Sequence, residues 1–158
     1  MVEISCDLSL IDNTTGREFE TFMVELFEKL GYSTTITNRS KDHGCDMMLQ
    51  QGEHRIAVQA KRSESELNFT SVQRALDSLK KYHAQLAIVV TNNKFISSAK
   101  QLAKIKNVAL IDRKKLLDLI ELSNLPVNHK KDLILFSTKI NQELIKQGID
   151  KRSFEFLG

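Results

Sequence analysis

The amino-acid sequence predicts one α/β domain in which a mixed β-sheet is flanked by helices. An apolar stripe of helical period over residues 19–30 precedes three short segments rich in β-forming residues. Further along, the apolar run over residues 86–91 has the length of a strand covered on both faces, and segments of helical period lie around it. The predicted order is α-β-β-β-α-β-α-β-α, followed by one extra C-terminal helix. A hairpin followed by strand–helix alternation indicates a mixed sheet with helices on both faces.

The first helix has the clearest boundaries. Thr15 and Glu18 stand at the spacing of a capping box, in which two side chains satisfy backbone N–H groups at the start of a helix. Gly31 is placed to end the helix, because glycine adopts a left-handed backbone conformation without steric cost. The buried stripe between them consists of Phe19, Phe22, Met23, Leu26, Phe27 and Leu30.

The later elements follow from alternating patterns and turn residues. The three strands are expected over Tyr32–Thr37, Cys45–Gln50 and Arg55–Ala60, with a polar turn over Asn38–Gly44 and a tight turn at Gly52 and Glu53. After a loop over Ser63–Phe69, we expect a helix carrying Val72, Ala75, Leu76 and Leu79, a strand over Leu86–Thr91, a helix carrying Ala99, Leu102 and Ala103, a strand over Val108–Ile111, and a helix carrying Leu116, Leu117 and Ile120.

The C-terminal part is expected to be a separate extension. Pro126, the only proline, separates the α/β unit from a helix over about His129–Gln147, which Gly148 ends. We therefore expect a domain over residues 1–124 and a helical extension over residues 125–158.

Composition excludes several classes of protein. The apolar share of 41% and the charged share of 27% are typical of a globular domain and argue against disorder. No uninterrupted apolar stretch approaches the ~18 residues of a membrane helix, and the N-terminus has no signal core, so a cytoplasmic location is expected. Two cysteines without zinc spacing argue against a zinc site. The net charge of +3 decides nothing by itself, although basic residues surround the candidate site.

That candidate site lies on the predicted hairpin. If Gly52 and Glu53 form the turn, the register places Asp46 directly opposite Gln59. Alternation places Lys61 on the same face as Gln59. A carboxylate, an amide oxygen and an ammonium then meet on one patch, which suits a magnesium ion with oxygen ligands and a phosphate to be hydrolysed. Because Gln59 is neutral, weaker metal binding is expected than with a glutamate.

The first helix offers a further acid. Glu20 lies about a quarter-turn from the centre of the apolar stripe, at the border between helix and sheet. Each residue also has a plainer interpretation: an isolated aspartate is usually a turn residue, and a Gln-x-Lys pattern on a strand is usually an exposed edge.

Taken together, the motifs resemble the Mrr-like restriction endonuclease family of the PD-(D/E)xK nucleases. The segments that carry the resemblance are Gly16–Glu20, Leu30–Tyr32, Asp42–Asp46, Val58–Arg62, Val90–Asn92 with Phe95 and Ala99, and Leu110–Asp112. The resemblance covers roughly residues 15–120 and implies a restriction-endonuclease-like fold. It also implies metal binding by Asp46, with Gln59 where most of the superfamily carries glutamate. Lys61 matches the catalytic lysine and Glu20 the helix glutamate.

The expected activity is magnesium-dependent hydrolysis of DNA, with manganese able to substitute, in restriction or defence. Contacts with DNA are expected from Arg39, Lys41, His43 and Arg62. Asp42 and Gln73 are expected to lie outside the metal ligands and to orient them by hydrogen bonds. Two alternatives stay open: a nucleic-acid-binding module that keeps the fold without catalysis, and a nuclease resembling the archaeal Holliday junction resolvases. Mrr-type enzymes usually carry a recognition domain before the nuclease domain. Target recognition is therefore expected from loops, a dimer, the C-terminal helix or a separate target-recognition protein. Because a single site cuts one strand, a homodimer is also expected.

Overall fold

The structure is a computed structural model that describes residues 8–40 and 44–124. Side chains are described for these residues except residue 8, residues 38–40 and residues 44–46. Lys41, Asp42 and His43, together with the expected extension over residues 125–158, lie outside the described residues. In the described part, no helix is long and apolar enough to span a membrane.

The centre of the fold is a mixed five-stranded sheet in the order β1-β2-β3-β4-β5. β2 runs antiparallel to both of its neighbours, β1 and β3, whereas β3, β4 and β5 are parallel to one another. This confirms the predicted mixed sheet. The strands are β1 (Ser33–Ser40), β2 (Gly44–Gln51), β3 (His54–Lys61), β4 (Leu86–Thr91) and β5 (Val108–Ile111).

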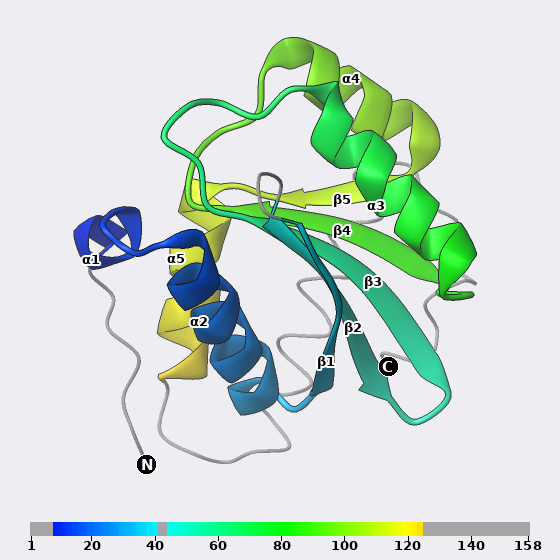
Figure 1. Ribbon diagram of the computed structural model, residues 1–158, viewed down its shortest axis with the longest axis horizontal. Coiled ribbons are helices and arrows are strands. Elements are labelled where there is room, and N and C mark those ends of the chain that lie inside the picture. Colours follow the sequence, from blue (N-terminus) through cyan, green and yellow to red (C-terminus); the bar gives the residue numbers. More distant parts are fainter. Residues whose placement is uncertain (1–7, 41–43, 125–158) are drawn as a thin grey trace.

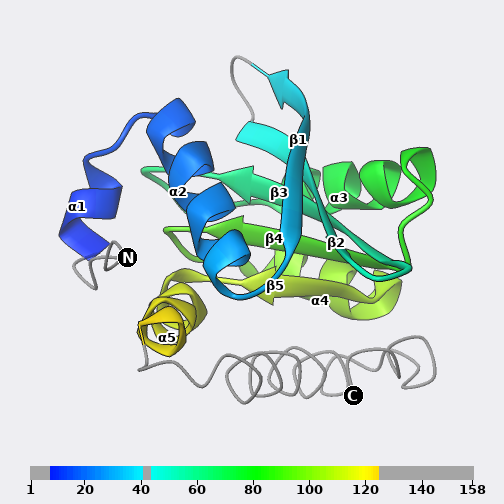
Figure 2. The same cartoon turned by 90° about the horizontal axis from the view of Figure 1, so that it is seen from below.

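Helices cover both faces of the sheet. Helices α2 and α5 lie against one face and α3 and α4 against the other, while the short α1 lies beyond α2 (Figure 1; Figure 2). The sequence pattern did not predict α1, because five residues are too few for a helical period to be recognised. The helices are α1 (Leu8–Asp12), α2 (Gly16–Lys29), α3 (Phe69–Lys81), α4 (Ser97–Lys106) and α5 (Arg113–Ser123).

Both ends of α2 form as the sequence predicts. At the start, the Thr15 hydroxyl accepts a hydrogen bond from Glu18 N at 3.1 Å, and Glu18 Oε1 accepts one from Thr15 N at 3.0 Å. At the end, Gly31 has a φ of 102°. The N–H groups of Gly31 and Tyr32 donate to Glu28 O and Phe27 O, both at 3.0 Å. These two hydrogen bonds satisfy backbone carbonyls that have no hydrogen-bond partner within the last turn of the helix.

The hairpin between β2 and β3 also has the predicted register. Its turn consists of Gly52 and Glu53, and Gly52 has a φ of 61°, as the first position of a glycine-initiated hairpin turn requires. Gln51 pairs with His54, so the whole strand pair is in the expected alignment. On the other side of β2, a bulge at Thr37 shifts the pairing with β1.

Two apolar cores form, one on each face of the sheet. The larger packs α2 and α5 against side chains such as Val58 and Ala60 of β3. The smaller packs α3 and α4 against Ala87 and Val89 of β4. Strands β3 and β4 are therefore covered on both sides, which explains why β4 is buried along its full length.

Candidate functional site

Strand pairing brings three of the predicted site positions together. Asp46 of β2 stands directly opposite Gln59 of β3, and Lys61 follows at the end of β3. Gln59 pairs with Val89, which belongs to the core under α3 and α4. Because paired and alternate positions share a face, these three positions all lie on the α3 side of the sheet. The side chain of Asp46 is outside the description, so its place is given by the backbone register alone.

Gln59 is the one polar residue in the buried stretch of β3, residues 56–60. Its relative exposure is 1%, and its Oε1 atom accepts no hydrogen bond although the residue has other interactions. Buried amides are costly unless they interact, so a glutamine in such a place indicates a polar role. Lys61, by contrast, is half-buried and reaches the surface at the end of the strand.

Glu20 lies in a different layer of the molecule. It belongs to the buried side of α2 with a relative exposure of 6%, and α2 packs against the face of the sheet that carries Val58 and Ala60. Glu20 makes an interaction there, as a buried carboxylate must. The fold thus joins Asp46, Gln59 and Lys61 by strand register, whereas Glu20 approaches from the opposite face.

The oxygen-donor set suits a hard divalent cation. Asp46, Gln59 and Glu20 offer carboxylate and amide oxygens, the ligands that magnesium takes when it keeps part of its water shell. No group of three His, Cys, Asp or Glu side chains that could hold a metal occurs among the described residues. The predicted set includes only two carboxylates, and one of them, that of Asp46, is outside the description. The chemistry of the donors, rather than a complete ligand cage, is what fits a metal ion.

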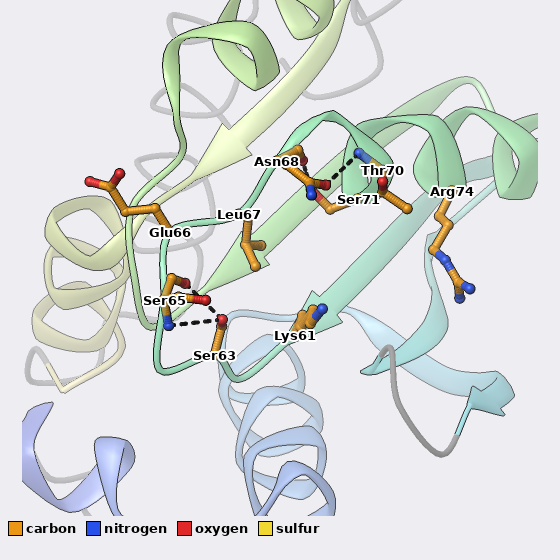
Figure 3. A pocket seen from close by; sticks show the side chains of 9 residues that line it. All are labelled: Lys61, Ser63, Ser65, Glu66, Leu67, Asn68, Thr70, Ser71 and Arg74. Atoms are coloured by element: carbon orange, nitrogen blue, oxygen red, sulfur yellow. Dashed lines mark hydrogen bonds between the residues drawn. The ribbon is translucent and has the colours of Figure 1, made fainter.

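A pocket of about 130 Å³ opens beside Lys61, between the end of β3 and the first turns of α3 (Figure 3). Arg74 of α3 lines it together with Lys61, so two cations face one cavity. Another wall is built by the loop over residues 63–68, which contributes the hydroxyl groups of Ser63 and Ser65. Figure 3 shows the carboxylate of Glu66 pointing away from both cations.

The remaining predicted residues are placed as follows. Arg62 is half-buried and forms an ion pair with the exposed Glu64 at 3.4 Å. Gln73 is exposed on α3, and its Nε2 donates to Asp77 within the helix at 3.4 Å. The backbone of Arg39 lies in β1, but its side chain is outside the description. Lys41, Asp42 and His43 lie outside the described residues.

A second polar cluster connects the ends of β3, β4 and β5 with α1. Arg113 Nη1 donates to Asp12 Oδ1 at 2.7 Å and to Asn92 O at 3.0 Å. Asn92 is buried; its Nδ2 donates to Asp12 Oδ1 at 3.0 Å, while its Oδ1 accepts from Ser63 N at 2.8 Å. This cluster fixes the start of the loop that leads from Lys61 to α3.

The hydrogen bond from Arg113 lowers the pKa of Asp12 below its ordinary value, and Asn92 and the charges of Arg113 and Arg62 act in the same direction against burial. The same contact raises the pKa of Arg113. Asp12 is therefore ionised at neutral pH.

Sequence reasoning assigned no role to Arg74, Asn92, Asp12 or Arg113. Arg74 follows Gln73 by one residue, so only the rotation of α3 about its axis, which its apolar positions define, could have indicated it. Asn92 was detectable as a polar residue directly after an apolar strand. The Asp12–Arg113 pair joins residues 101 positions apart, and no local pattern records such a contact.

The sequence matches the family model Mrr_cat, described as "Restriction endonuclease", over residues 11–120. No curated protein matches the sequence.

Three solved structures resemble the fold. A structure titled "Crystal Structure of Protein of Unknown Function AF1548" has a TM-score of 0.53 and 13% identity over 90% of this chain and 93% of its own. The DNA modification-dependent restriction endonuclease AspBHI has a TM-score of 0.57 and 17% identity over 85% of this chain and 38% of its own. The MspJI restriction endonuclease, in complex with a 27-mer oligonucleotide, has a TM-score of 0.47 and 16% identity over 86% of this chain and 34% of its own. At these identities the likeness concerns the fold alone.

Proposed function

Because the chain belongs to the Mrr_cat family of restriction endonucleases, which covers residues 11–120, we propose that it is a divalent-metal-dependent endonuclease that hydrolyses phosphodiester bonds of DNA. The observation that carries this proposal is the register of the β2–β3 hairpin, which sets Asp46 opposite Gln59 and places Lys61 on the same face. These residue types, close together at one end of two inner strands, suit phosphate chemistry.

Each residue has a distinct part in the proposed site. The Lys61 ammonium is a compact charge with three N–H donors, so it can hold a phosphate oxygen and stabilise the charge that grows there during hydrolysis. Gln59 is held in place by burial between two neighbouring strands, which fixes where its amide oxygen points. Asp46 supplies the negative charge, and Glu20 is proposed as a further acid from the α2 side.

Asp46 and Gln59 would hold the metal, which we propose to be magnesium, with manganese as a substitute. Glu20, proposed as a third ligand, would have to reach it around the end of the strands from the α2 side. When bound, such an ion neutralises charge on the phosphate and provides an activated water. The neutral amide of Gln59 gives the site one negative charge fewer than a glutamate would, so weak binding that keeps several waters is expected.

The test is plasmid cleavage in the presence of Mg²⁺ or Mn²⁺. Asp46→Ala and Lys61→Ala should each lower the cleavage rate by on the order of 100-fold or more, the scale of losing one group that stabilises charge in a transition state. Lys104→Ala removes an exposed charge from the last turn of α4, at the other end of the sheet, and should cleave as the natural protein does. Cleavage that survives both site substitutions would refute the assignment.

The neutral Gln59 also favours a second candidate, a nucleic-acid-binding module that keeps this fold without catalysis. That candidate predicts tight DNA binding, no Mn²⁺ binding by calorimetry, and no cleavage. A heat of Mn²⁺ binding that disappears in Asp46→Ala would exclude it.

The chain spans only 38% of AspBHI, so activities of the whole of that enzyme do not transfer with the fold. We propose that target choice depends on further parts, either a second copy of this chain or a separate recognition protein. A homodimer is the simpler solution for cutting both strands, since one such site acts on one strand at a time.

A further inference from the structure

The lining of the pocket beside Lys61 carries two cations and one carboxylate, that of Glu66, which points away from both (Figure 3). Lys61 and Arg74 both line it, and within residues 8–40 and 44–124 neither forms an ion pair with a carboxylate. The neighbouring Arg62, by comparison, is paired with Glu64, and Arg113 with Asp12. Two half-buried cations that share a cavity repel each other, so an anion between them would be favoured.

The size of the cavity limits what that anion can be. Its volume of about 130 Å³ lies below the roughly 300–1,000 Å³ typical of pockets for whole small molecules. Because the cavity is open to solvent, it can take a single tetrahedral anionic group while the rest of a larger ligand lies outside it.

Most polar groups around the cavity already form hydrogen bonds within the protein. The Ser63 hydroxyl donates to Ser65 O at 2.7 Å, and the Ser71 hydroxyl donates to Asn68 O at 3.0 Å, so both stabilise the loop. Asn68 Oδ1 also accepts from Thr70 N at 2.9 Å, which already caps the start of α3. The exposed hydroxyl of Thr70 remains at the rim. The attraction for an anion thus comes mainly from the two cations.

We propose that this pocket binds a backbone phosphate of the DNA strand that Lys61 acts on, with Arg74 as the principal positioning contact. The inference rests on the proposed function, because it takes DNA as the ligand of the same site. An arginine suits this part, since its planar fork can donate two hydrogen bonds to one phosphate. Phe69, the first residue of α3, is 53% exposed and does not line the pocket, so it would meet only parts of the DNA that lie outside the cavity. An exposed aromatic ring can stack against a base.

The experiment measures DNA affinity of the full chain without divalent metal, so that nothing is cleaved. A fluorescent duplex is titrated at several salt concentrations between about 50 and 200 mM. Over this range, DNA affinity falls with salt more steeply when more phosphates are contacted. Arg74→Ala should bind more weakly and reduce the slope of log affinity against log salt by about one, as expected for one lost phosphate contact. Lys104→Ala removes the same charge at the opposite end of the sheet and should keep the natural slope.

Two further measurements separate a phosphate contact from a structural role. Arg74→Lys keeps the positive charge and should keep the salt slope of the natural protein. If Arg74 had only a structural role, Arg74→Lys and Arg74→Ala should weaken DNA binding alike. Duplexes carrying one neutral methylphosphonate are then compared position by position. At one position in the DNA, the neutral group should lower the affinity of the natural protein by as much as Arg74→Ala does. The same duplex should cause no further loss of affinity with Arg74→Ala.

The outcomes separate this inference from the proposed activity. If the natural protein binds DNA without cutting it and Arg74→Ala weakens binding, the pocket assignment stands and the proposed catalysis fails. If the protein cuts DNA but Arg74→Ala binds and responds to salt as Lys104→Ala does, the pocket assignment fails and catalysis stands. If inorganic phosphate stabilises the natural protein but not Arg74→Ala against heat, while their DNA affinities are equal, the pocket takes free anions and the inference is wrong. Absence of both binding and cleavage refutes both.

Discussion

At the scale of single residues, the proposed site has a buried amide at a position where a carboxylate could stand. Gln59 is 1% exposed and stands opposite Asp46 in the register. A carboxylate in its place would put two negative charges about 4.5–5.5 Å apart at their Cβ atoms. Without a cation, that arrangement costs stability, because like charges in a buried place disfavour ionisation. We therefore expect the glutamine to cost the hairpin less stability than a carboxylate when no ion is bound.

Gln59→Glu therefore has a definite expected result. In the absence of metal, the variant should melt at a lower temperature than the natural protein. Addition of Mn²⁺ should raise its melting temperature by more than that of the natural protein, because affinity rises with the number of charged ligands. Differential scanning calorimetry with and without Mn²⁺ measures both effects.

The control is Gln101→Glu, which makes the same chemical change at an exposed position on α4. Its response to Mn²⁺ should equal that of the natural protein. If Gln59→Glu and Gln101→Glu respond alike, position 59 does not contact a metal.

At the scale of elements, two short-range signals determine the parts that carry the site. The capping box and Gly31 fix α2, and the two-residue turn at Gly52 fixes the register of β2 with β3. Both signals act over a few residues, so they could be predicted from the sequence, and with them the pairing of Asp46 and Gln59.

Gly31→Ala tests the end of α2. With a φ of 102°, alanine would be strained there, and the free energy of unfolding should fall by roughly 1–2 kcal/mol, the cost of a left-handed conformation for a residue with a Cβ. Gly16→Ala, at the start of the same helix, meets nothing within 4 Å and should not lower stability. Urea denaturation of both variants provides the measurement, and equal stability of the two would contradict this account of the helix end.

The contact between α1 and α5 could not be predicted, because it depends on tertiary packing. Asp12 and Arg113 meet only after the ends of β4 and β5 have come together around Asn92. Gln73 and Arg74 illustrate the same limit: the sequence indicates a helix, but only the packed structure shows which of two neighbouring residues lines the pocket.

Asp12→Asn should reveal the contribution of this contact through its pH dependence. Because the pKa of Asp12 is lowered in the folded state, its stabilising effect is present above the ordinary carboxylate pKa and is lost as pH falls through the folded-state pKa. The ion pair is about one-third exposed. The expected loss at neutral pH is therefore small, roughly 0.5–1 kcal/mol, and smaller still in high salt.

Urea denaturation of both proteins at neutral pH and at pH values below about 4 should show this difference shrinking in acid. Asp118→Asn removes an exposed carboxylate from α5 outside this cluster and serves as the control. A difference for Asp12→Asn that stays constant across pH would exclude the proposed origin of the effect.

At the scale of the whole molecule, the mixed sheet brings the end of β3 beside the first turns of α3. The parallel pairing of β3 with β4 requires a crossover, and α3 with its preceding loop provides it. That crossover places Arg74 near Lys61, while α2 covers the other face. The alternation of hairpin and crossover units made the architecture predictable. The position of Glu20 relative to the sheet depends on how α2 packs, and only the structure places it in the opposite layer.

The most direct test of the central claim is anomalous diffraction from crystals of the protein soaked in Mn²⁺. The proposed site requires a manganese peak in contact with a carboxylate oxygen of Asp46 and the amide oxygen of Gln59, close to Lys61. No peak at this edge of the sheet, or a peak bound only by residues elsewhere, would contradict the claim that this hairpin forms the metal centre of a nuclease.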